Sequence, residues 1–125
     1  MISVKPIKNL TNNEIIECNK LINLNFENNR FNDYKIVIIY KKNNIIIGFV
    51  GIYDNLLNQL CTNLEYRRMG IATEIINISK KIMKKPIYLF IDKKNNNIEY
   101  LLHFYKKNNF EIESENDIEY KMIYI

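Results

Sequence analysis

The sequence has no tryptophan, a single alanine, three glycines, two prolines and two cysteines among its 125 residues. Two widely separated cysteines, Cys18 and Cys61, are too few for the disulfide framework of a small secreted domain, and their spacing is not that of a metal site. No apolar run approaches the roughly 18 residues that a membrane-spanning helix needs, and residues 1–10 lack the apolar core of a signal peptide. These absences predict a cytoplasmic protein with reduced thiols, no bound metal and no membrane association.

The composition predicts a folded domain. Hydrophobic residues make up 47% of the chain and aromatic residues 12%, which is enough apolar side chain to build a core rather than a disordered tail. A chain of 125 residues is long enough for one domain and short for two, so we expect a single domain over residues 1–125. The net charge of +4 suits an anionic ligand or nucleic acid. Because the basic residues are scattered along the chain, the charge alone selects neither.

Three helices are expected where apolar residues recur at helical spacing. The first runs from Thr11 or Asn12, either of which can cap it, to about Leu24. The second has isoleucines at positions 71, 75, 78 and 82 on its buried face and extends to Lys85, where Pro86 ends it. The third covers residues 98–108 and has its apolar face at positions 98, 101, 102 and 105.

Strands are expected between these helices. Residues 34–53 are typical of a hairpin around a Lys-Asn-Asn turn, and its second arm is apolar on both faces, as in a strand covered on both sides. One strand precedes the first helix, and others are expected at 56–64, 87–91, 110–113 and 118–125. This order predicts a mixed α/β domain in which the helix that starts at residue 71 crosses over between the strands at 56–64 and 87–91.

The stretch YRRMGIATEII, residues 66–76, joins a basic segment, a glycine and a helical pattern. Free N–H groups in the first turn of a helix point outward, and the helix dipole adds partial positive charge there, so such a helix start suits a phosphate. Gly70 lets the backbone approach a ligand closely, and Arg67 and Arg68 add positive charge. The stretch predicts a diphosphate site, although an ordinary strand-to-helix turn with solvated arginines would use the same residue types.

The pattern Arg67-x-x-Gly70-x-Ala72 resembles the acetyl-CoA pyrophosphate loop of the GNAT superfamily of N-acetyltransferases. A second motif, HFYKKNNF at 103–110, resembles the Tyr-x-x-x-Gly-Phe ending of the family's next helix. The motifs cover about residues 34–110, and the order of elements matches along the whole chain. The resemblance implies a GNAT-like, mostly antiparallel sheet with splayed central strands, flanked by helices. It also implies transfer of an acetyl group from acetyl-CoA directly to a primary amine of a small molecule or protein.

The resemblance also implies roles for particular residues. The strand at 60–62 would bind the pantetheine arm and polarise the thioester carbonyl through backbone N–H groups, and residues 67–73 would hold the pyrophosphate. Tyr105 stands where the family commonly has the tyrosine that protonates the departing CoA thiolate. Asn97 lies one residue before the usual position of a CoA-contacting asparagine. The residues implied to contact acetyl-CoA are Leu60, Cys61, Thr62, Arg67, Arg68, Met69, Gly70, Ile71, Ala72, Thr73, Asn97 and Tyr105.

The chain departs from the family pattern at two further places. Asn109 replaces the usual glycine, and asparagine also tolerates the left-handed conformation. The strand LLNQL carries no carboxylate where several family members have a glutamate base. Five alternatives stay open: a water ordered by Asn58 or Gln59, or a base at Asp54, Glu27 or Asp33. The last two residues, in the loop at 25–33, would attract a cationic amine, although an exposed polar loop explains them equally.

Three other interpretations compete with these assignments. Residues 48–53, GFVGIY, partly match the RNA-recognition-motif strand, but its leading basic residue, glycine and aromatic are replaced by isoleucines, which disfavours nucleic acid. A GNAT fold that binds acyl-CoA without turnover is a closer alternative. Tyr105 shares the apolar face of its helix and would also fit as a core tyrosine. The acceptor amine and the choice between monomer and homodimer are left open by the sequence.

Overall fold

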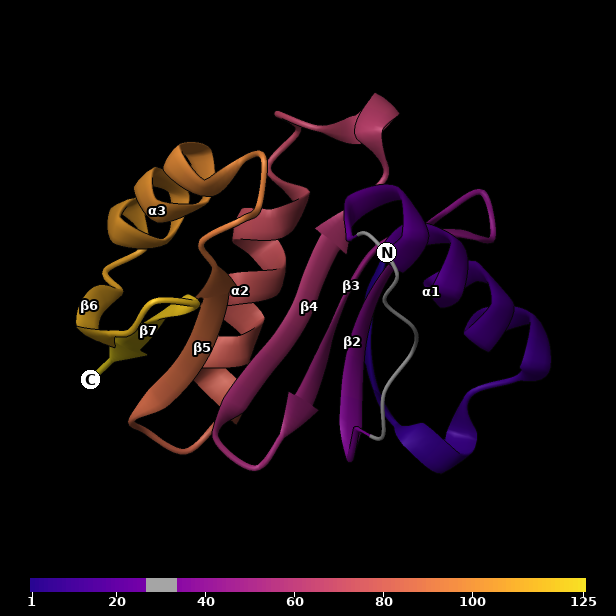
Figure 1. Ribbon diagram of the computed structural model, residues 1–125. Coiled ribbons are helices and arrows are strands. Elements are labelled where there is room, and N and C mark those ends of the chain that lie inside the picture. Colours follow the sequence, from indigo (N-terminus) through magenta and orange to yellow (C-terminus); the bar gives the residue numbers. More distant parts are fainter. Residues whose placement is uncertain (27–33) are drawn as a thin grey trace.

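The computed structural model describes residues 1–26 and 34–125 and contains one sheet flanked by helices (Figure 1). The elements in chain order are β1 (Ile2–Pro6), the 3-10 turn η1 (Ile7–Asn9), α1 (Asn12–Asn25), β2 (Ile36–Lys42), β3 (Ile45–Tyr53), β4 (Leu56–Thr62), the 3-10 turn η2 (Leu64–Tyr66), α2 (Ile71–Ile82), β5 (Ile87–Asp92), α3 (Ile98–Lys107), β6 (Glu111–Glu115) and β7 (Glu119–Tyr124). The predicted order of helices and strands is confirmed.

The seven strands lie in the order β1-β2-β3-β4-β5-β7-β6. Neighbours are antiparallel except for β4 and β5, which are parallel and joined by the crossover helix α2. Their pairing is confined to Leu56 opposite Tyr88 at the start of both strands, and the strands then diverge (Figure 1). A mostly antiparallel sheet with splayed central strands is therefore confirmed.

Helices α1 and α2 cover opposite faces of the sheet (Figure 1). Successive strand residues point to opposite faces, so β2 contributes to both cores. Val37 and Ile39 pack with Cys18 and Ile22 of α1, whereas Ile38 packs with α2 residues such as Ile75. The interior of β3 is buried from Ile46 to Ile52, as the apolar pattern on both of its faces predicted.

The predicted end of α2 was wrong. The helix ends at Ile82 rather than Lys85, and the next residue, Met83, has extended backbone angles and is buried. Pro86 disfavours helical conformation in Lys85, the residue before it. Because the helix ends earlier still, at Ile82, the Met83 side chain can reach the core. Consequently Ile82 is 45% exposed, and Ile76 with Ser79 fills the buried face instead. The strand predicted at 56–64 likewise stops at Thr62, where η2 follows.

Asparagines supply the left-handed residues of two turns. Asn43 and Asn44, between β2 and β3, have φ values of 52° and 66°. Positive φ at both central residues suits the two-residue turn of a twisted hairpin, and asparagine tolerates it. Asn109, after α3, has φ of 70°, so asparagine does adopt the left-handed conformation at this position.

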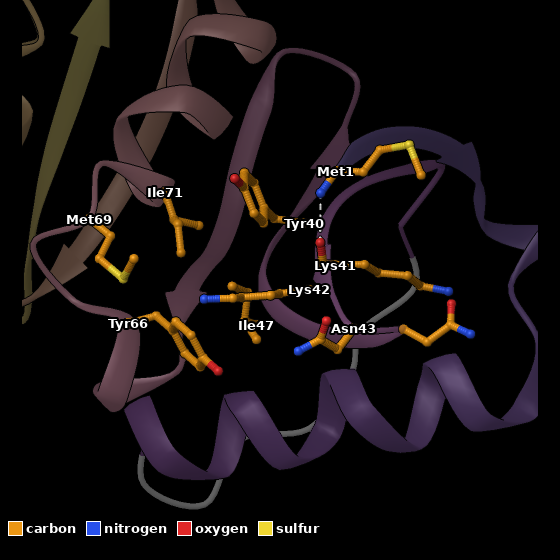
Figure 2. A pocket seen from close by; sticks show the side chains of 10 residues that line it. Met1, Tyr40, Lys41, Lys42, Asn43, Ile47, Tyr66, Met69 and Ile71 are labelled. Carbon is orange, nitrogen blue, oxygen red and sulfur yellow. Dashed lines mark hydrogen bonds between the residues drawn. The ribbon is translucent and has the colours of Figure 1, made fainter.

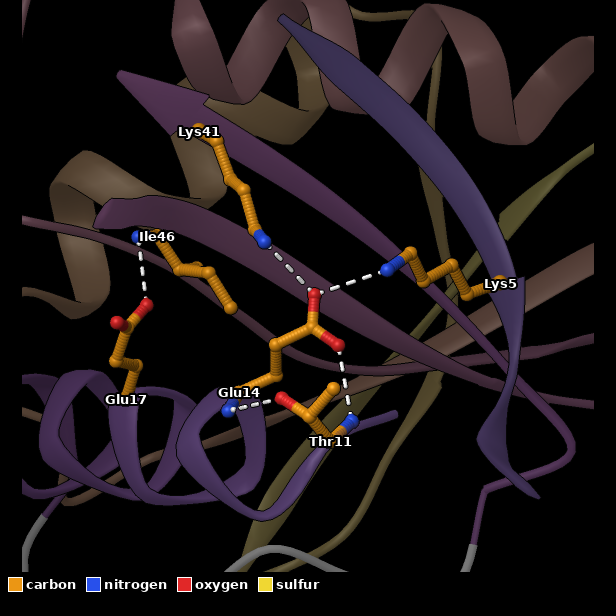
Figure 3. A network of polar contacts seen from close by, with 6 residues as sticks. All are labelled: Lys5, Thr11, Glu14, Glu17, Lys41 and Ile46. Carbon is orange, nitrogen blue, oxygen red and sulfur yellow. Dashed lines mark hydrogen bonds and ion pairs between the residues drawn. The ribbon is translucent and has the colours of Figure 1, made fainter. Parts of the chain in front are cut away.

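A buried carboxylate fixes the start of α1 (Figure 3). The Thr11 side chain accepts a hydrogen bond from the Glu14 backbone N–H, and Glu14 Oε1 accepts one from the Thr11 N–H, which forms a capping box. Glu14 Oε2 also pairs with Lys5 at 3.0 Å and Lys41 at 2.9 Å. Burial alone would raise the pKa of Glu14, but the Thr11 hydrogen bond and the two lysines outweigh it and lower this pKa to about 2.

The charge of Glu14 is expected to stabilise the fold in a pH-dependent way. A carboxyl whose pKa is lowered by folding contributes stability above its unfolded pKa and loses it as pH falls through its folded pKa, here between about 4.5 and about 2. Urea unfolding should show Glu14→Gln less stable than the parent by roughly 2 kcal/mol at pH 6, with the difference shrinking toward pH 2. Glu111→Gln, on the exposed edge strand β6, is the control. A difference for Glu14→Gln that is the same at both pH values would contradict this account.

Candidate functional site

A β-bulge interrupts β4 near the gap between β4 and β5. Cys61 lies opposite Phe49, but Asn58 lies opposite Gly51, so β4 has one residue more than β3 in this interval. Gln59 takes φ of 58°, a left-handed conformation that is rare for a non-glycine residue and is often found at functional sites. A bulge bends a strand and turns its backbone groups. The backbone of Leu60–Thr62 therefore borders the gap, where the pairing of β4 with β5 has already ended.

The loop after η2 leads into the uncapped start of α2. Gly70, the residue before the helix, has φ of 79° and no side chain to cap the helix. A Cβ atom placed on Gly70 would meet no heavy atom within 4 Å, so the space beside it is open. Among the described residues, none accepts hydrogen bonds from the N–H groups of residues 71–73. This helix start thus offers free donors and open space to an anion.

Arg67 is tied to the end of α1. Its Nη2 donates to Asn25 Oδ1 at 3.1 Å, and Asn25 Nδ2 donates to the carbonyls of Leu21 and Thr62 at 2.8 and 3.0 Å. Asn25 therefore connects the last turn of α1, the end of β4 and the loop. This role of Asn25 was not predicted from the sequence, because a polar residue near a helix end carries no signal of a partner 42 positions away.

Tyr105 comes from α3 and is 8% exposed. Its ring packs edge-on against Phe104 and Phe110, with centroid distances of 5.2 and 5.7 Å. Burial raises the pKa of Tyr105 well above its usual value, and the nearby Cys61 thiol adds to this shift. Tyr105 belongs to the core cluster that contains Leu89 and Ile91 of β5, and Leu60 of β4 packs against this cluster. In the part of the chain that the structure describes, no residue hydrogen-bonds the Tyr105 hydroxyl, so it keeps its donor for a ligand.

The geometry agrees with a match to a known family. A family model described as an acetyltransferase (GNAT) domain matches residues 32–112, more than half of the chain. The chain belongs to the GNAT acetyltransferase family. Residues 48–53 of this GNAT domain, which had suggested RNA binding, lie in β3. Phe49 and Val50 are 0% exposed and Tyr53 alone of the stretch is exposed, so Phe49 cannot stack on a base as the RNA-binding pattern requires.

Solved structures with the same fold cover almost the whole GNAT domain. Escherichia coli ElaA is 13% identical, with a TM-score of 0.77 and coverage of 100% of this chain and 99% of that one. An acyl-CoA N-acyltransferase from Pseudomonas aeruginosa is 12% identical, with a TM-score of 0.78 and the same coverage. Arabidopsis thaliana Naa50, in complex with a bisubstrate CoA analogue, is 19% identical, with a TM-score of 0.74 and coverage of 99% and 98%. No curated protein matches the sequence. At these identities the neighbours establish the fold.

Two buried thiols lie in the core of the GNAT domain. Cys18 of α1 and Cys61 of β4 are free and belong to the same apolar cluster. Burial raises the pKa of Cys18 to about 12, with Glu14 and Glu17 adding to the shift, and burial raises the pKa of Cys61 well above its usual value. Since the thiolate is the nucleophile, both groups are better suited to packing than to an acyl-enzyme.

The other candidate residues of the GNAT domain differ in position. Asn97 precedes α3 and is exposed. Because β4 and β5 are parallel, Asn97, which follows β5, lies at the same end of the sheet as the 67–70 loop, which follows β4. Asn58 is half-buried in β4, and Gln59 is buried at the bulge. Asp54 lies in the turn before β4, whereas Cys61 lies at the other end of that strand. The Asp54 carboxylate also pairs with Lys35 at 2.7 Å, and both facts argue against Asp54 as the base. Glu27 and Asp33 lie outside the described residues.

Two features are missing from the described part of the GNAT domain. The His, Cys, Asp and Glu residues placed by the structure form no group of three that would hold a metal ion. None of the helices described is both long and apolar enough to span a membrane.

Two replacements of Gly70 test whether its left-handed backbone and the open space beside it are needed for acetyl-CoA binding. Valine disfavours the left-handed conformation by about 1–2 kcal/mol, and its side chain would fill the open space beside the helix start. We expect Gly70→Val to weaken acetyl-CoA binding in calorimetry by roughly tenfold or more, with little change in the melting temperature. Gly70→Asn keeps the left-handed backbone and should weaken binding less. Equal affinities of the valine variant and the parent would remove the basis for this site.

Removal of the Arg67 side chain tests its share of the same contact. If its guanidinium reaches the diphosphate, Arg67→Ala should weaken acetyl-CoA binding by roughly 1.5–3 kcal/mol. Asn25→Ala removes the residue that now orients Arg67 and should give a smaller loss. Calorimetry at low and high salt checks both values, since a charge contact weakens with ionic strength. A loss in Asn25→Ala as large as that in Arg67→Ala would point to loop position rather than charge.

Proposed function

We propose that this chain is an acetyl-CoA-dependent N-acetyltransferase that moves an acetyl group directly to a primary amine of a small molecule or protein. The observation that carries the proposal is the gap between β4 and β5, which has the bulged strand on one side. The uncapped start of α2 lies beyond the end of β4, and Tyr105 lies in the core cluster against which Leu60 of β4 packs. Solved neighbours with the same fold include an aminoglycoside 6'-N-acetyltransferase complexed with coenzyme A and the bisubstrate complex of Naa50, which support this class of reaction.

The donor set fits acetyl-CoA. The free N–H groups at residues 71–73 and the open space at Gly70 suit a diphosphate. Arg67 and Arg68, both exposed, would add charge, with Met69, Ala72 and Thr73 completing the loop. Leu60, Cys61 and Thr62 would hold the pantetheine arm through the backbone of β4. Acetyl-CoA supplies the acetyl thioester, and this chain supplies position and hydrogen bonds.

The chemistry assigned to this chain has two parts. A backbone N–H at the bulged end of β4 would donate to the thioester oxygen, where negative charge grows as the amine attacks the carbonyl carbon. Tyr105 would donate a hydrogen bond, and then its proton, to the departing sulfur. Its raised pKa keeps the proton on the phenol throughout the neutral range, so Tyr105 is always in the donating form. The same burial makes the phenolate costly, so the tyrosine must regain its proton before the next cycle.

The acceptor amine must lose a proton to a base, for which the chain offers several candidates. Asn58 and Gln59 lie on β4 and are the described residues that would order a water for this purpose. Glu27 and Asp33 stay candidates and would favour a cationic amine. The proposal places the enzyme in the cytoplasm, as a monomer or homodimer.

A non-catalytic acyl-CoA-binding domain is the second candidate. It is favoured by one observation: in the described part of the chain, β4 carries amides rather than carboxylates near the gap. A thioester-cleavage assay with a panel of amines separates the two candidates. If the protein binds acetyl-CoA but cleaves it with none of the small amines, aminoglycosides or peptides tested, the non-catalytic binding domain is favoured.

The Tyr105 hydroxyl should matter for rate and not for folding. Tyr105→Phe keeps the ring and its packing against Phe104 and Phe110, so the melting temperature should barely change. Once an accepted amine has been found, kcat should fall by roughly 10²–10⁴-fold, with a smaller effect on acetyl-CoA binding. Tyr100→Phe, on the exposed side of the same helix, is the matched control and should be silent. If Tyr105→Phe transfers acetyl groups at the parent rate, Tyr105 is a core residue alone.

A further inference from the structure

A cavity lies beside the 67–70 loop, between the β2–β3 turn and the start of α2 (Figure 2). Its volume is about 470 Å³, which lies in the range of small-molecule sites. Apolar and aromatic side chains form much of its wall: Met1, Tyr40, Ile47, Tyr66, Met69 and Ile71.

The cavity is separate from the gap proposed for acetyl-CoA. Its wall comes from β2, β3, their turn and the segment 66–71, and β2 and β3 lie on the side of β4 away from β5. Neither Tyr105 nor any residue of β4 or β5 lines it. The two spaces therefore meet only at the loop that leads into α2.

Two cations that pair with no described carboxylate line the cavity: Lys42 and the Met1 α-ammonium, which donates to the Lys41 carbonyl at 2.6 Å. The Lys42 Nζ lies 5.0 Å from the centroid of the Tyr66 ring, and Figure 2 shows the Lys42 side chain extending toward that ring. Lys41 also lines the cavity, but its ammonium pairs with Glu14 at 2.9 Å. Within residues 1–26 and 34–125, Lys42 forms no ion pair, and no aspartate or glutamate lines the wall. An anion entering here meets the Lys42 ammonium, the Met1 α-ammonium that already donates to a carbonyl, and no described carboxylate.

We propose that this cavity binds a planar aromatic carboxylate. Tyr40 and Tyr66 offer aromatic surface, and Ile47 and Met69 offer apolar contacts for a ring. Lys42 supplies a charge-assisted hydrogen bond to the carboxylate, and Asn43 at the turn adds an amide donor to the cavity wall. Lys42 would repel a cationic ligand, and a purely apolar ligand would leave the Lys42 ammonium without an acceptor.

The position of the cavity couples it to the acetyl-CoA loop. Met69 and Ile71 line it and lie on either side of Gly70, and Ile71 provides one of the free N–H groups at the helix start. A bound carboxylate favours the loop arrangement that it contacts and so changes the affinity for acetyl-CoA. By linkage, bound acetyl-CoA must change the affinity for the carboxylate by the same factor. This coupling rests on the proposed function, whereas binding of the carboxylate does not.

Methyl NMR tests the binding directly. The protein labelled with ¹³C at its methionine methyl groups is titrated with 2-naphthoate, and with 2-naphthamide as the neutral match. We expect 2-naphthoate to shift the Met69 signal saturably and to bind about tenfold more tightly than the amide. Met122, fully buried in the core, should not move. Equal shifts at both methionines, or no saturable shift at Met69, would overturn the proposal.

Variants and competition complete the test. Lys42→Met removes the ammonium but keeps an unbranched side chain, and it should weaken 2-naphthoate about tenfold while leaving the amide unchanged. Lys20→Met, on the exposed side of α1, is the control and should bind like the parent. Unchanged 2-naphthoate affinity in Lys42→Met would overturn the assignment. Simple competition between CoA and 2-naphthoate would also overturn it, because the cavity would then be part of the acetyl-CoA site. If the protein does not bind CoA at all, the titration still decides the carboxylate site.

Discussion

The parting of two parallel strands in the middle of the sheet is the constraint on which the rest of the structure depends. Unpaired backbone N–H and C=O groups inside a protein are unfavourable unless another partner satisfies them. Here β4 and β5 pair at a single position and then separate, and the bulge at Gln59 turns the exposed edge of β4. A ligand lying along this edge can supply the hydrogen bonds that a neighbouring strand would otherwise make.

Packing on both faces keeps β4 in place although it lacks a full partner. On one face α1 buries Cys18 and Ile22 against β2 and β3, and on the other α2 buries Ile75 and Ile76. The Asn25 side chain links α1 to the end of β4 and to Arg67. The buried Glu14 and its lysines fix the other end of α1. The sheet is thus held open by its helices, with polar contacts at both ends of α1.

Tyr105 shows how one side chain serves both packing and chemistry. Its ring belongs to the same core as Phe110 and Leu89, which holds the phenol at one orientation without any hydrogen bond from a described residue. That position is fixed by this core, which brings α3 together with residues of α2 and β4 that are distant in sequence. A core tyrosine and a proton donor are therefore compatible interpretations of the same residue.

Local sequence was sufficient for the elements and for the loop before α2. Helical spacing, the Thr11 cap, the asparagine turns and Gly70 act over a few residues, so they were readable before the structure, as was the family from its two motifs. The end of α2 was not, because Met83 leaves the helix to fill a core that local spacing does not show. The left-handed Gln59, the Arg67–Asn25 contact and the cavity around Lys42 were equally hidden. Each depends on how β2, β3 and β4 register against one another and against the helices, and those long-range contacts exist only in the folded chain.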